Sequence, residues 1–598
     1  MLVSGGVHNS SLLTESLFVC LFASSVVSLC SISSLLVQAL ITIHKMEKLK
    51  NKYILFFFMV SFILPIHGQY LPKDGAKLNY NQIYFEYPFN KDAKFYTVYI
   101  TFDSIVNPTN KDFIVKQQEK SPLLLVKNLK LGKKYKWFVE TTLRNNEKIK
   151  STYFNFSILN TYMANPKLYK AIQHYNKKSE IQDGIIWCDQ YRCAVDRAGN
   201  IVWFMATEQL DLINAKVVRD IQLYPDGSMT FVHQPNASRM DIDLNSIWKA
   251  PYKGTVSESD REDYHHAFTM LSNGNYMILG DEKVKFSNDT VTTDAVNFCN
   301  IIEFDTASNI VWSWRMKDYF PYEYLINSKI PTKSGIVDPH ANSFTIDEKN
   351  NAIYLSFRDI SRVIKIDKKT KNIIASYGVK LKDEDDVFET DLFRLQHDIQ
   401  LLENNDMLIF NNNDIDSGKT SCVEIVHFPI SKKDSFQLKW KFDLNYDKES
   451  KGKVQRMGGV KIMPNGNYLI CEGSNNRVVE INQKKEILWD FALRQVDSTG
   501  KVNDKFALYR ANYSSCLYPY YYGATLDENY LTIFNKGCED DGYKIELLFK
   551  NSSKQEIITE SVKSNQSLKL KLPVTILDID KVIIISLKSG KQKVVNVK

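Results

Sequence analysis

The sequence lacks the features that mark nucleotide-binding and nucleic-acid-binding proteins. Its net charge is only +7 over 598 residues and no stripe of Lys and Arg runs along any segment, so no nucleic acid partner is expected. It has no Gly-rich loop of the kind that surrounds phosphates, so we expect no nucleotide cofactor. Its nine cysteines have no zinc-ligand spacing. The chain is instead rich in aromatic residues, 12% of the total, with moderate Gly and Pro, as in a globular β-rich protein.

The first 69 residues have the character of targeting sequence. Residues 16–43 are uncharged and mostly apolar, which is long enough to span a bilayer. Residues 46–69 combine a basic start, an apolar run and a small-residue exit, the three regions of a secretory signal peptide. We interpret residues 1–45 as a mis-started extension, with a membrane anchor as the alternative. Either interpretation predicts an exported protein, periplasmic or extracellular and in the second case membrane-associated.

Seven of the cysteines follow this segment, an odd number that leaves at least one thiol unpaired. Cys188 and Cys193 are close enough in sequence to bridge a turn. Cys516 and Cys538 are placed to close a loop in the last repeat. Export makes disulfides plausible, although connectivity cannot be derived from sequence. We therefore treat these as two candidate pairs.

Residues 70–160 contain short apolar runs with alternating polarity, separated by turn residues. Examples are the runs at 95–100 and 135–140. Short strands at this spacing predict a β-sandwich. The run that starts at Leu129, Leu-Lys-Leu-Gly-Lys-Lys-Tyr-Lys-Trp, resembles a strand and turn of a fibronectin type III domain. We therefore expect a fibronectin-III-like β-sandwich at the N-terminus of the exported chain.

A four-strand unit recurs between residue 165 and about residue 550. One half of the unit is a hairpin whose second strand ends in Trp, as in the runs from Cys193, Ile301 and Val478. The other half carries Asn-Gly or Asp-Gly turns, which form tight hairpins because both central residues need positive φ. Units of this size predict the blades of a β-propeller, and roughly six fit. The predicted fold is thus all-β, a six-bladed β-propeller after the sandwich. Residues 551–598 form a C-terminal β segment that either closes the ring or stands alone.

Three histidines occupy equivalent places in this repeat, namely His266, His340 and His397. Each starts a short alternating strand that leads into a polar turn. A lone His in such a strand is more often buried against a backbone carbonyl. Three in register favour one shared site, because equivalent inner positions of the blades meet at the propeller axis. The register favours His266 over its neighbour His265, which remains the alternative.

Arg358 ends a strand one hairpin arm after His340. A guanidinium is a rigid fork of donors that suits sulfate, phosphate or carboxylate. Its fixed positive charge also disfavours a metal cation beside the imidazoles. The alternative is a surface arginine paired with Asp359. Together with the histidines, Arg358 favours a site for a tetrahedral anion without a metal.

This set of residues resembles the bacterial arylsulfate sulfotransferases, which work without a nucleotide sulfate donor. The matching motifs are Tyr-His-His-Ala-Phe at His266, Asp-Pro-His-Ala-Asn-Ser at His340, Ser-Phe-Arg-Asp at Arg358 and Leu-Gln-His-Asp-Ile at His397. Members of that family are exported six-bladed propellers with an N-terminal β-sandwich. The resemblance covers most of the chain after Tyr70 and is weakest in the last fifty residues.

The resemblance implies a role for each residue. His397 would be the nucleophile, taking a sulfuryl group from an aryl sulfate as a sulfohistidine and passing it to a phenol in a ping-pong reaction. His340 and Arg358 would stabilise the charge on the transferring oxygens. His266 would join them or protonate the leaving phenolate. Asn342 would add a substrate-binding donor.

Aryl sulfates and phenols are the partners that this resemblance implies, with no cofactor. A homodimer and attachment to a membrane through the N-terminus are further expectations. Two other functions stay open at this point. Three histidines on a propeller axis would also suit a divalent metal ion. The third possibility is a propeller that binds a ligand without catalysis.

Overall fold

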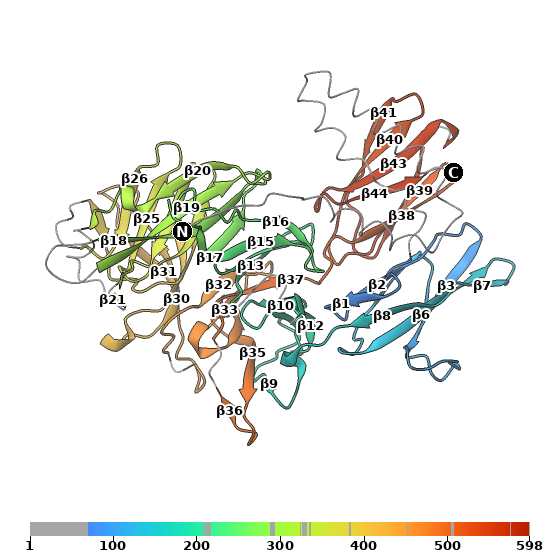
Figure 1. Cartoon of the computed structure of the whole chain (residues 1–598), viewed down its shortest axis with the longest axis horizontal. Coiled ribbons are helices and arrows are strands. Elements are labelled where there is room, and N and C mark those ends of the chain that lie inside the picture. Colours follow the sequence, from blue (N-terminus) through green and yellow to red (C-terminus); the bar gives the residue numbers. More distant parts are fainter. Residues whose placement is uncertain are drawn as a thin grey trace, which may run out of the picture. The chain divides into compact units, whose positions relative to one another are not determined.

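The protein is described here by a computed structural model, which covers residues 70–206, 208–209, 217–286, 294–322, 325, 332–333, 336–381, 384, 386–450, 452–503, 507–573 and 576–596. The expected extension at 1–45 and signal peptide at 46–69 lie outside these residues. Within them the bounded elements are β-strands and short 3₁₀ turns, which confirms the all-β class (Figure 1). No helix among them is long and apolar enough to cross a membrane. The 3₁₀ turns are Tyr162–Ala164, Met316–Asp318, Glu403–Asn405, Ile415–Ser417, Gly473–Asn475 and Ile576–Asp578.

The N-terminal strands form two sheets with a shared core. The larger sheet has the order β1-β8-β6-β3-β4 with β7 beside β6, and the smaller pairs β2 with β5. Alternate residues of β3, such as Val98 and Ile100, are buried with Phe85 of β2 and Trp137 of β6. The strands are β1 (Ala76–Leu78), β2 (Ile83–Glu86), β3 (Ala93–Phe102), β4 (Val115–Glu119), β5 (Leu123–Val126), β6 (Lys134–Leu143), β7 (Lys148–Lys150) and β8 (Phe154–Ile158).

Six sheets built on four antiparallel strands follow among the described residues. Their strand orders are β12-β11-β10-β37, β13-β14-β15-β16, β17-β18-β19-β20, β23-β24-β25-β26, β28-β29-β30-β31 and β32-β33-β34-β35. The bounds are β10 (Ile185–Cys188), β11 (Cys193–Asp196), β12 (Ile201–Phe204), β13 (Arg219–Leu223), β14 (Met229–His233), β15 (Asn236–Met240), β16 (Ser246–Lys249), β17 (Asp263–Met270), β18 (Tyr276–Phe286), β19 (Asp294–Phe304), β20 (Ile310–Arg315), β23 (Ala341–Asp347), β24 (Ala352–Phe357), β25 (Arg362–Asp367), β26 (Ile373–Gly378), β28 (Asp398–Leu401), β29 (Asp406–Asn411), β30 (Cys422–His427), β31 (Gln437–Asp443), β32 (Gly459–Ile462), β33 (Tyr468–Cys471), β34 (Val478–Ile481), β35 (Ile487–Val496) and β37 (Ala511–Ser514).

Five shorter strands extend these sheets. They are β9 (Tyr169–Ile172) and β36 (Val502–Asn503) beside β35, β22 (Ile336–Val337) beside β19, β21 (Thr332–Lys333) beside β22, and β27 (Val387–Glu389) beside β26.

The inner strands of the sheets contact one another in a closed ring. β13 contacts β17, β17 contacts β23, β23 contacts β28, β28 contacts β32, and β32 contacts β37, which itself contacts β13. β37 comes from the far end of this region and pairs with β10, with Ile185 opposite Ser514 and Cys188 opposite Ala511. A ring of radial sheets that the last strand closes onto the first is the architecture of a β-propeller.

The C-terminal strands make two sheets of their own, with orders β38-β39-β42 and β41-β40-β43-β44, around a separate apolar core. Because β37 already completes the ring, residues 522–550, expected from the sequence to belong to the propeller, form these two sheets together with residues 554–596. The strands are β38 (Tyr522–Asp527), β39 (Tyr530–Asn535), β40 (Tyr543–Phe549), β41 (Lys554–Ile558), β42 (Ser567–Lys571), β43 (Ile579–Ser586) and β44 (Gln592–Asn596).

The two candidate cysteine pairs have different outcomes. Cys516 and Cys538 form a disulfide, which ties the end of the ring to the C-terminal sheets. Cys188 and Cys193 face each other across β10 and β11 but are both free thiols, so the pairing considered for them is wrong. Both are fully buried in an apolar layer, where a reduced cysteine packs as a small apolar side chain.

Replacing both Cys516 and Cys538 by Ala should lower the free energy of unfolding by about 3 kcal/mol, because the closed loop of 22 residues no longer restricts the unfolded chain. Thermal unfolding with and without reductant measures this. Wild-type protein should lose stability when reduced, whereas the double variant should be indifferent to reductant. Equal melting of oxidised and reduced wild type would contradict the prediction.

Candidate functional site

Two of the predicted histidines stand on strained backbone at the inner edge of the ring. His266 in β17 has φ of 57° and His340, just before β23, has φ of 61°. The pairing register shifts beside each of them, between His265 and Phe268 and between Ala341 and Ser343. A β-bulge redirects the side chain that it carries, and positive φ at a non-glycine residue costs about 1–3 kcal/mol. The surrounding sheets therefore hold both imidazoles in orientations that a regular strand would not give.

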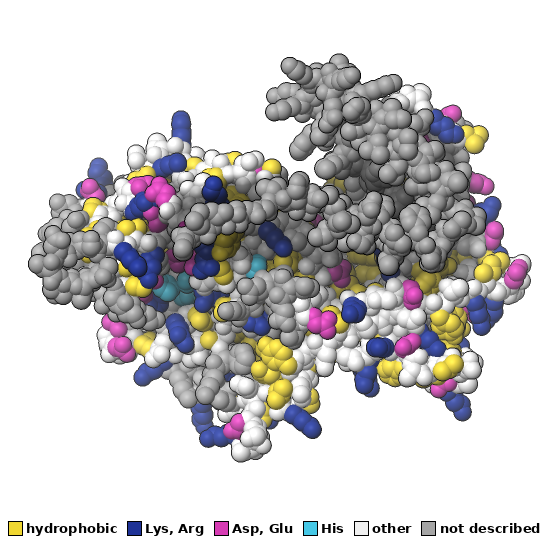
Figure 2. Space-filling model, in the orientation of Figure 1, with side chains coloured by type: hydrophobic (Ala, Val, Ile, Leu, Met, Phe, Trp, Pro, Cys, Tyr) yellow, Lys and Arg dark blue, Asp and Glu magenta, His cyan; other side chains and the backbone are white. Residues whose placement is uncertain are grey.

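The three predicted histidines come together from three different sheets. The ring centroid of His266 lies 4.9 Å from that of His340 and 6.4 Å from that of His397. Tyr509, from the segment that leads into β37, completes the group with its ring centroid 5.0 Å from His397 and 5.7 Å from His266. Histidine side chains are visible in cyan on the face shown in Figure 2, with Lys and Arg side chains in dark blue beside them.

His397 is held as a neutral imidazole with one nitrogen free. Its side chain is buried, and Nδ1 lies 3.1 Å from the carbonyl oxygen of Gly458. A carbonyl only accepts, so Nδ1 carries the hydrogen and Nε2 keeps its lone pair. Burial first, and then the charge of Arg510, hold the pKa of His397 well below its usual range. At neutral pH the ring therefore offers an unprotonated Nε2.

Gly458 is required for this hydrogen bond. Its φ is 106°, and a Cβ atom at this position would lie 2.3 Å from the ring of Phe410. Its amide also donates to the carbonyl of Tyr509 at 3.1 Å. Only glycine satisfies both the backbone conformation and the close approach.

Arg358 and His340 form the more exposed part of the site, with side chains 20% and 30% exposed. The Arg358 guanidinium pairs with Asp359 and donates through Nη2 to the Gln455 carbonyl at 2.8 Å. The surface pair considered from sequence is thus present. The same positive charge also acts on the ring of His397 and helps to lower its pKa. Burial likewise lowers the pKa of His340, against the charges of nearby carboxylates.

Sequence reasoning missed two buried residues of the site, Tyr509 and Arg510. Arg510 Nη1 lies 2.5 Å from Asp220 Oδ1, and its Nη2 lies 3.4 Å from Asp398 Oδ1. Asp398 is therefore occupied by Arg510 and not by the neighbouring ring of His397. No repeat pattern marks Tyr509 and Arg510, because they belong to the segment that closes the ring.

Arg219 is a third residue that was not assigned to the site, although its position matches that of His266 in the repeat. Its guanidinium lies 5.5 Å from the ring centroid of Tyr509 and its charge contributes to lowering the pKa of His266, after burial and the neighbouring histidines. The repeat register that identified the three histidines also includes Arg219, so this register could have assigned Arg219 to the site.

Asn342 lies beside the site but its side chain is already engaged. Its Nδ2 donates to the Gln396 carbonyl at 2.8 Å, and the side chain is fully buried. The Asn342 carbonyl accepts from the Tyr509 hydroxyl at 3.0 Å and from Arg510 Nη2 at 3.2 Å. These bonds connect β23 to the segments around His397 and Tyr509. The substrate-binding role expected for this residue stays a prediction.

The choice between His265 and His266 is decided by their directions. His266 faces His340, His397 and Tyr509. His265 lies behind it, with Nε2 2.9 Å from Asp281 Oδ1 and Nδ1 2.5 Å from His266 Nδ1. Burial, the largest single effect, lowers the pKa of His265, but the carboxylates of Asp281, Asp338 and Asp263 together outweigh it, so that the pKa is raised overall. His266 is the residue that reaches the site.

The assembled site suits an anion better than a cation. Three imidazoles surround the centre while Arg358 and Arg219 supply fixed positive charge. Among the described residues, no group of three or more His, Cys, Asp or Glu side chains is arranged to hold a metal ion. The donor set therefore gives no support to the metal alternative.

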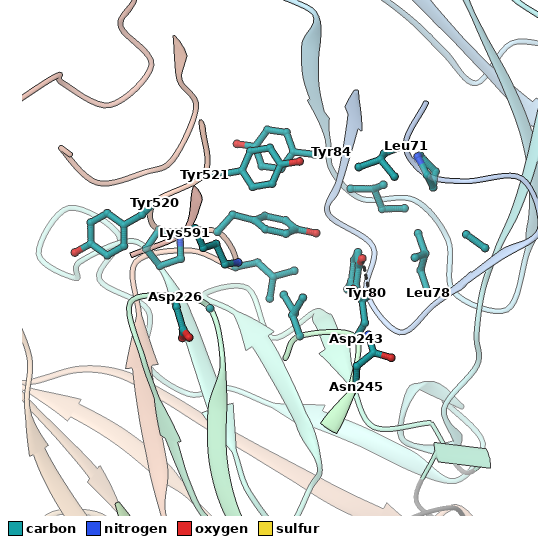
Figure 3. A pocket seen from close by; sticks show the side chains of 18 of the residues that line it. Leu71, Leu78, Tyr80, Tyr84, Asp226, Asp243, Asn245, Tyr520, Tyr521 and Lys591 are labelled. Atoms are coloured by element: carbon teal, nitrogen blue, oxygen red, sulfur yellow. Dashed lines mark hydrogen bonds between the residues drawn. The ribbon is translucent and has the colours of Figure 1, made fainter. Parts of the chain in front are cut away.

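A separate cavity of about 540 Å³ lies away from the histidines, between the N-terminal strands, the β13–β16 sheet and the C-terminal region (Figure 3). The rings of Tyr84 and Tyr521 stack at its wall with centroids 3.9 Å apart. The Tyr80 hydroxyl donates to Asp243 at 2.8 Å. Lys591 also lines the cavity. This cavity shares no lining residue with the histidine site.

Comparison with known proteins identifies one family. Residues 171–450 match the model of the family described as Arylsulfotransferase (ASST). This part of the chain contains all four residues whose motifs resemble that family, so the resemblance is confirmed for it. No protein of curated function matches the sequence significantly.

Solved structures give only distant likenesses. A streptogramin B lyase is 10% identical, with 72% of this chain and 98% of that chain covered and a TM-score of 0.26. A virginiamycin B lyase from Staphylococcus aureus is 9% identical, with 61% and 95% covered and a TM-score of 0.28. A periplasmic gluconolactonase from Pseudomonas aeruginosa is 10% identical, with 65% and 100% covered and a TM-score of 0.29.

Substituting Arg510 by Met should destabilise the ring severely, because Asp220 and Asp398 would remain buried without their shared cation. The expected loss in the free energy of unfolding is about 3–5 kcal/mol, as for other broken buried ion pairs. Denaturant unfolding measures it, with Arg144→Met at an exposed position as the matched control. Equal stability of the two variants would show that Arg510 is not structurally required.

Proposed function

We propose that this protein moves a sulfuryl group from an aryl sulfate donor to a phenolic acceptor, which the match of residues 171–450 to the arylsulfotransferase model supports. The transfer runs by a ping-pong mechanism through a sulfohistidine at His397. The observation that carries the proposal is the unprotonated Nε2 of His397, which the Gly458 carbonyl leaves free at a site with fixed positive charge. No nucleotide or metal takes part in this mechanism.

In the first half-reaction the Nε2 lone pair of His397 attacks the sulfur of the aryl sulfate. The N–S bond forms, the S–O bond to the aryl group breaks, and its electron pair leaves on the phenolate oxygen. Nδ1–H keeps its bond to Gly458 and is strengthened as a donor while positive charge develops on the ring. In the second half-reaction an acceptor phenol oxygen attacks the sulfur and the N–S bond breaks. Covalent catalysis thus divides one displacement into two easier ones.

The remaining residues stabilise charge and move the proton. Arg358 and His340 lie at the exposed side, where the sulfate oxygens would be held by pre-placed donors. His266 is the general acid that protonates the leaving phenolate oxygen and the base that accepts the proton of the acceptor phenol. Asn342 adds a donor for the substrate in this proposal, which requires its amide to exchange the Gln396 carbonyl for the substrate.

The finer fold assignment supports this reading. We take each of the six four-stranded sheets as one blade of a six-bladed propeller, and the two N-terminal sheets as a fibronectin-III-like sandwich. We also propose export to the periplasm or the extracellular space. The Cys516–Cys538 disulfide supports it, because such bonds persist in oxidising compartments. Homodimer formation and membrane attachment remain expectations from the sequence.

His397→Ala should abolish transfer from 4-nitrophenyl sulfate to phenol, with a loss of at least about 10³-fold, because the nucleophile is removed. The matched control is His427→Ala, which removes a histidine paired with Asp406 and Asp434 in another part of the ring. Its rate should be that of the wild type. Mass spectrometry after exposure to the sulfate without acceptor should locate one added sulfuryl group on His397.

Normal transfer by the His397→Ala variant would disprove the nucleophile. Stoichiometric metal in the purified protein, found by elemental analysis together with absent transfer, would favour the metal site instead. Absence of transfer, of metal and of a modified histidine would favour a ligand-binding propeller.

The release of 4-nitrophenol in the first half-reaction should stay constant from pH 8 down to about pH 5.5, where an ordinary histidine with pKa ~6.5 is mostly protonated. The reason is the lowered pKa of His397, which preserves the neutral nucleophile at acidic pH. Stopped-flow measurement of the burst rate tests this. A rate that halves near the ordinary histidine pKa would show that the ring is not shielded from protonation.

A further inference from the structure

Asp281, His265 and His266 form a row that leads from the outer part of β18 to the site. Asp281 Oδ1 lies 2.9 Å from His265 Nε2, and His265 Nδ1 lies 2.5 Å from His266 Nδ1. The His265 side chain is only 3% exposed, so water does not replace either partner. His266 at the end of the row faces His340 and His397. The proposed mechanism uses His266 and leaves the two residues behind it without a role.

The two Nδ1 atoms are close enough to share one hydrogen, so one ring must donate to the other. The Asp281 carboxylate favours a hydrogen on His265 Nε2. A second hydrogen, on Nδ1, makes His265 a cation, and this ring is then the donor to His266. The surrounding charges support that assignment. Burial lowers the pKa of His265, but the nearby carboxylates, Asp281 foremost, raise it overall. Burial and then the charge of His265 hold the pKa of His266 well below its usual range. His266 is then neutral, with Nδ1 accepting and Nε2–H pointing into the site.

We propose that Asp281 and His265 are positioning residues that hold His266 as an Nε2–H donor, supply it with a proton in the first half-reaction and take a proton back from it in the second. This inference rests on the proposed sulfuryl transfer. In this inference His265 and His266 act together, whereas the sequence offered them as alternatives for one role.

The proton count balances over the cycle. When the aryl S–O bond breaks, His266 Nε2 gives its proton to the phenolate oxygen, and the His265 Nδ1 proton passes to His266 Nδ1. His265 is left neutral and keeps its Nε2 hydrogen beside the Asp281 carboxylate. In the second half-reaction the acceptor phenol gives its proton to His266 Nε2, and the Nδ1 proton returns to His265.

Several charged groups face His265 and set the pH at which it loses its proton. Asp281 on β18, Asp263 on β17 and Asp338 before β23 favour the charged ring, and His340 opposes it. Because the pKa of His265 is raised overall, the row keeps its proton to higher pH than an ordinary histidine would. It loses its proton as the pH rises through that raised pKa.

The dependence on the leaving group tests the row. In the first half-reaction without acceptor, Asp281→Asn should slow phenol release from phenyl sulfate by about 10²-fold, since that phenolate leaves poorly without a proton. Release from 4-nitrophenyl sulfate should be nearly unchanged, because 4-nitrophenolate leaves unaided. Asp305→Asn is the matched control, since Asp305 lies in the exposed turn after β19 of the same sheet, where its carboxylate accepts from Asn309. It should leave the ratio of the two rates at the wild-type value.

Failure of the row and failure of the proposed function give different results. A variant that slows both sulfates equally shows a structural role for Asp281 and overturns the row, while the proposed function stands. A wild type that releases neither phenol from phenyl sulfate nor 4-nitrophenol from 4-nitrophenyl sulfate, with or without an acceptor phenol, overturns the proposed function and this inference with it.

Wild-type protein gives a second test that needs no substitution. The rate with phenyl sulfate should fall at alkaline pH as His265 loses its proton, and the rate with 4-nitrophenyl sulfate should not. Identical alkaline behaviour of the two substrates would overturn the inference.

Discussion

The buried guanidinium of Arg510 holds inner strands of the ring together and also acts on the imidazole of His397. Arg510 lies between Asp220 of β13 and Asp398 of β28, so it joins two inner strands that are not neighbours in sequence. It also donates to the Asn342 carbonyl at the start of β23. Three strands that carry or precede site residues are thus fixed to one cation in a medium of low dielectric. The same charge lowers the pKa of His397, so the tie that positions the imidazole also keeps it neutral.

Carboxylates extend this arrangement around the axis. Asp189 accepts from the backbone amides of Asp220, Tyr509 and Arg510, and burial raises its pKa to about 7 despite these bonds. The Asp220 and Asp398 carboxylates accept in turn from the amides of Phe268 and Val460 in the next sheets. Inner strands such as β13 and β17, or β28 and β32, are therefore joined through side chains where no ladder of backbone bonds exists. This is the polar counterpart of the apolar layers between the sheets.

The backbone is strained at two of the site histidines, and this strain is linked to the directions in which their imidazoles point. Left-handed backbone at His266 and His340 is unfavourable in a free chain, and the bulges that contain it are stabilised only by the flanking sheets. The cost is compensated by directions that regular strands cannot give. His265 and His266 are adjacent in sequence, yet the bulge lets both contribute to one row from Asp281 to the centre. The backbone at this point thus decides which imidazole meets the substrate.

The sequence by itself determined the all-β class, the repeat and the convergence of His266, His340 and His397, because residues at one point of a repeat fall at one point of a symmetric architecture. Its motifs also resemble the family whose model matches residues 171–450, and it offered Cys516–Cys538 as one of two candidate pairs, of which the structure forms this one. Only the tertiary structure decided the rest. Tyr509 and Arg510 join the site from the ring-closing segment, which follows no repeat, and residues 522–550 leave the ring because β37 has already filled the last place. The free Nε2 of His397 depends on a carbonyl 61 residues away, and no local pattern encodes a contact across that distance.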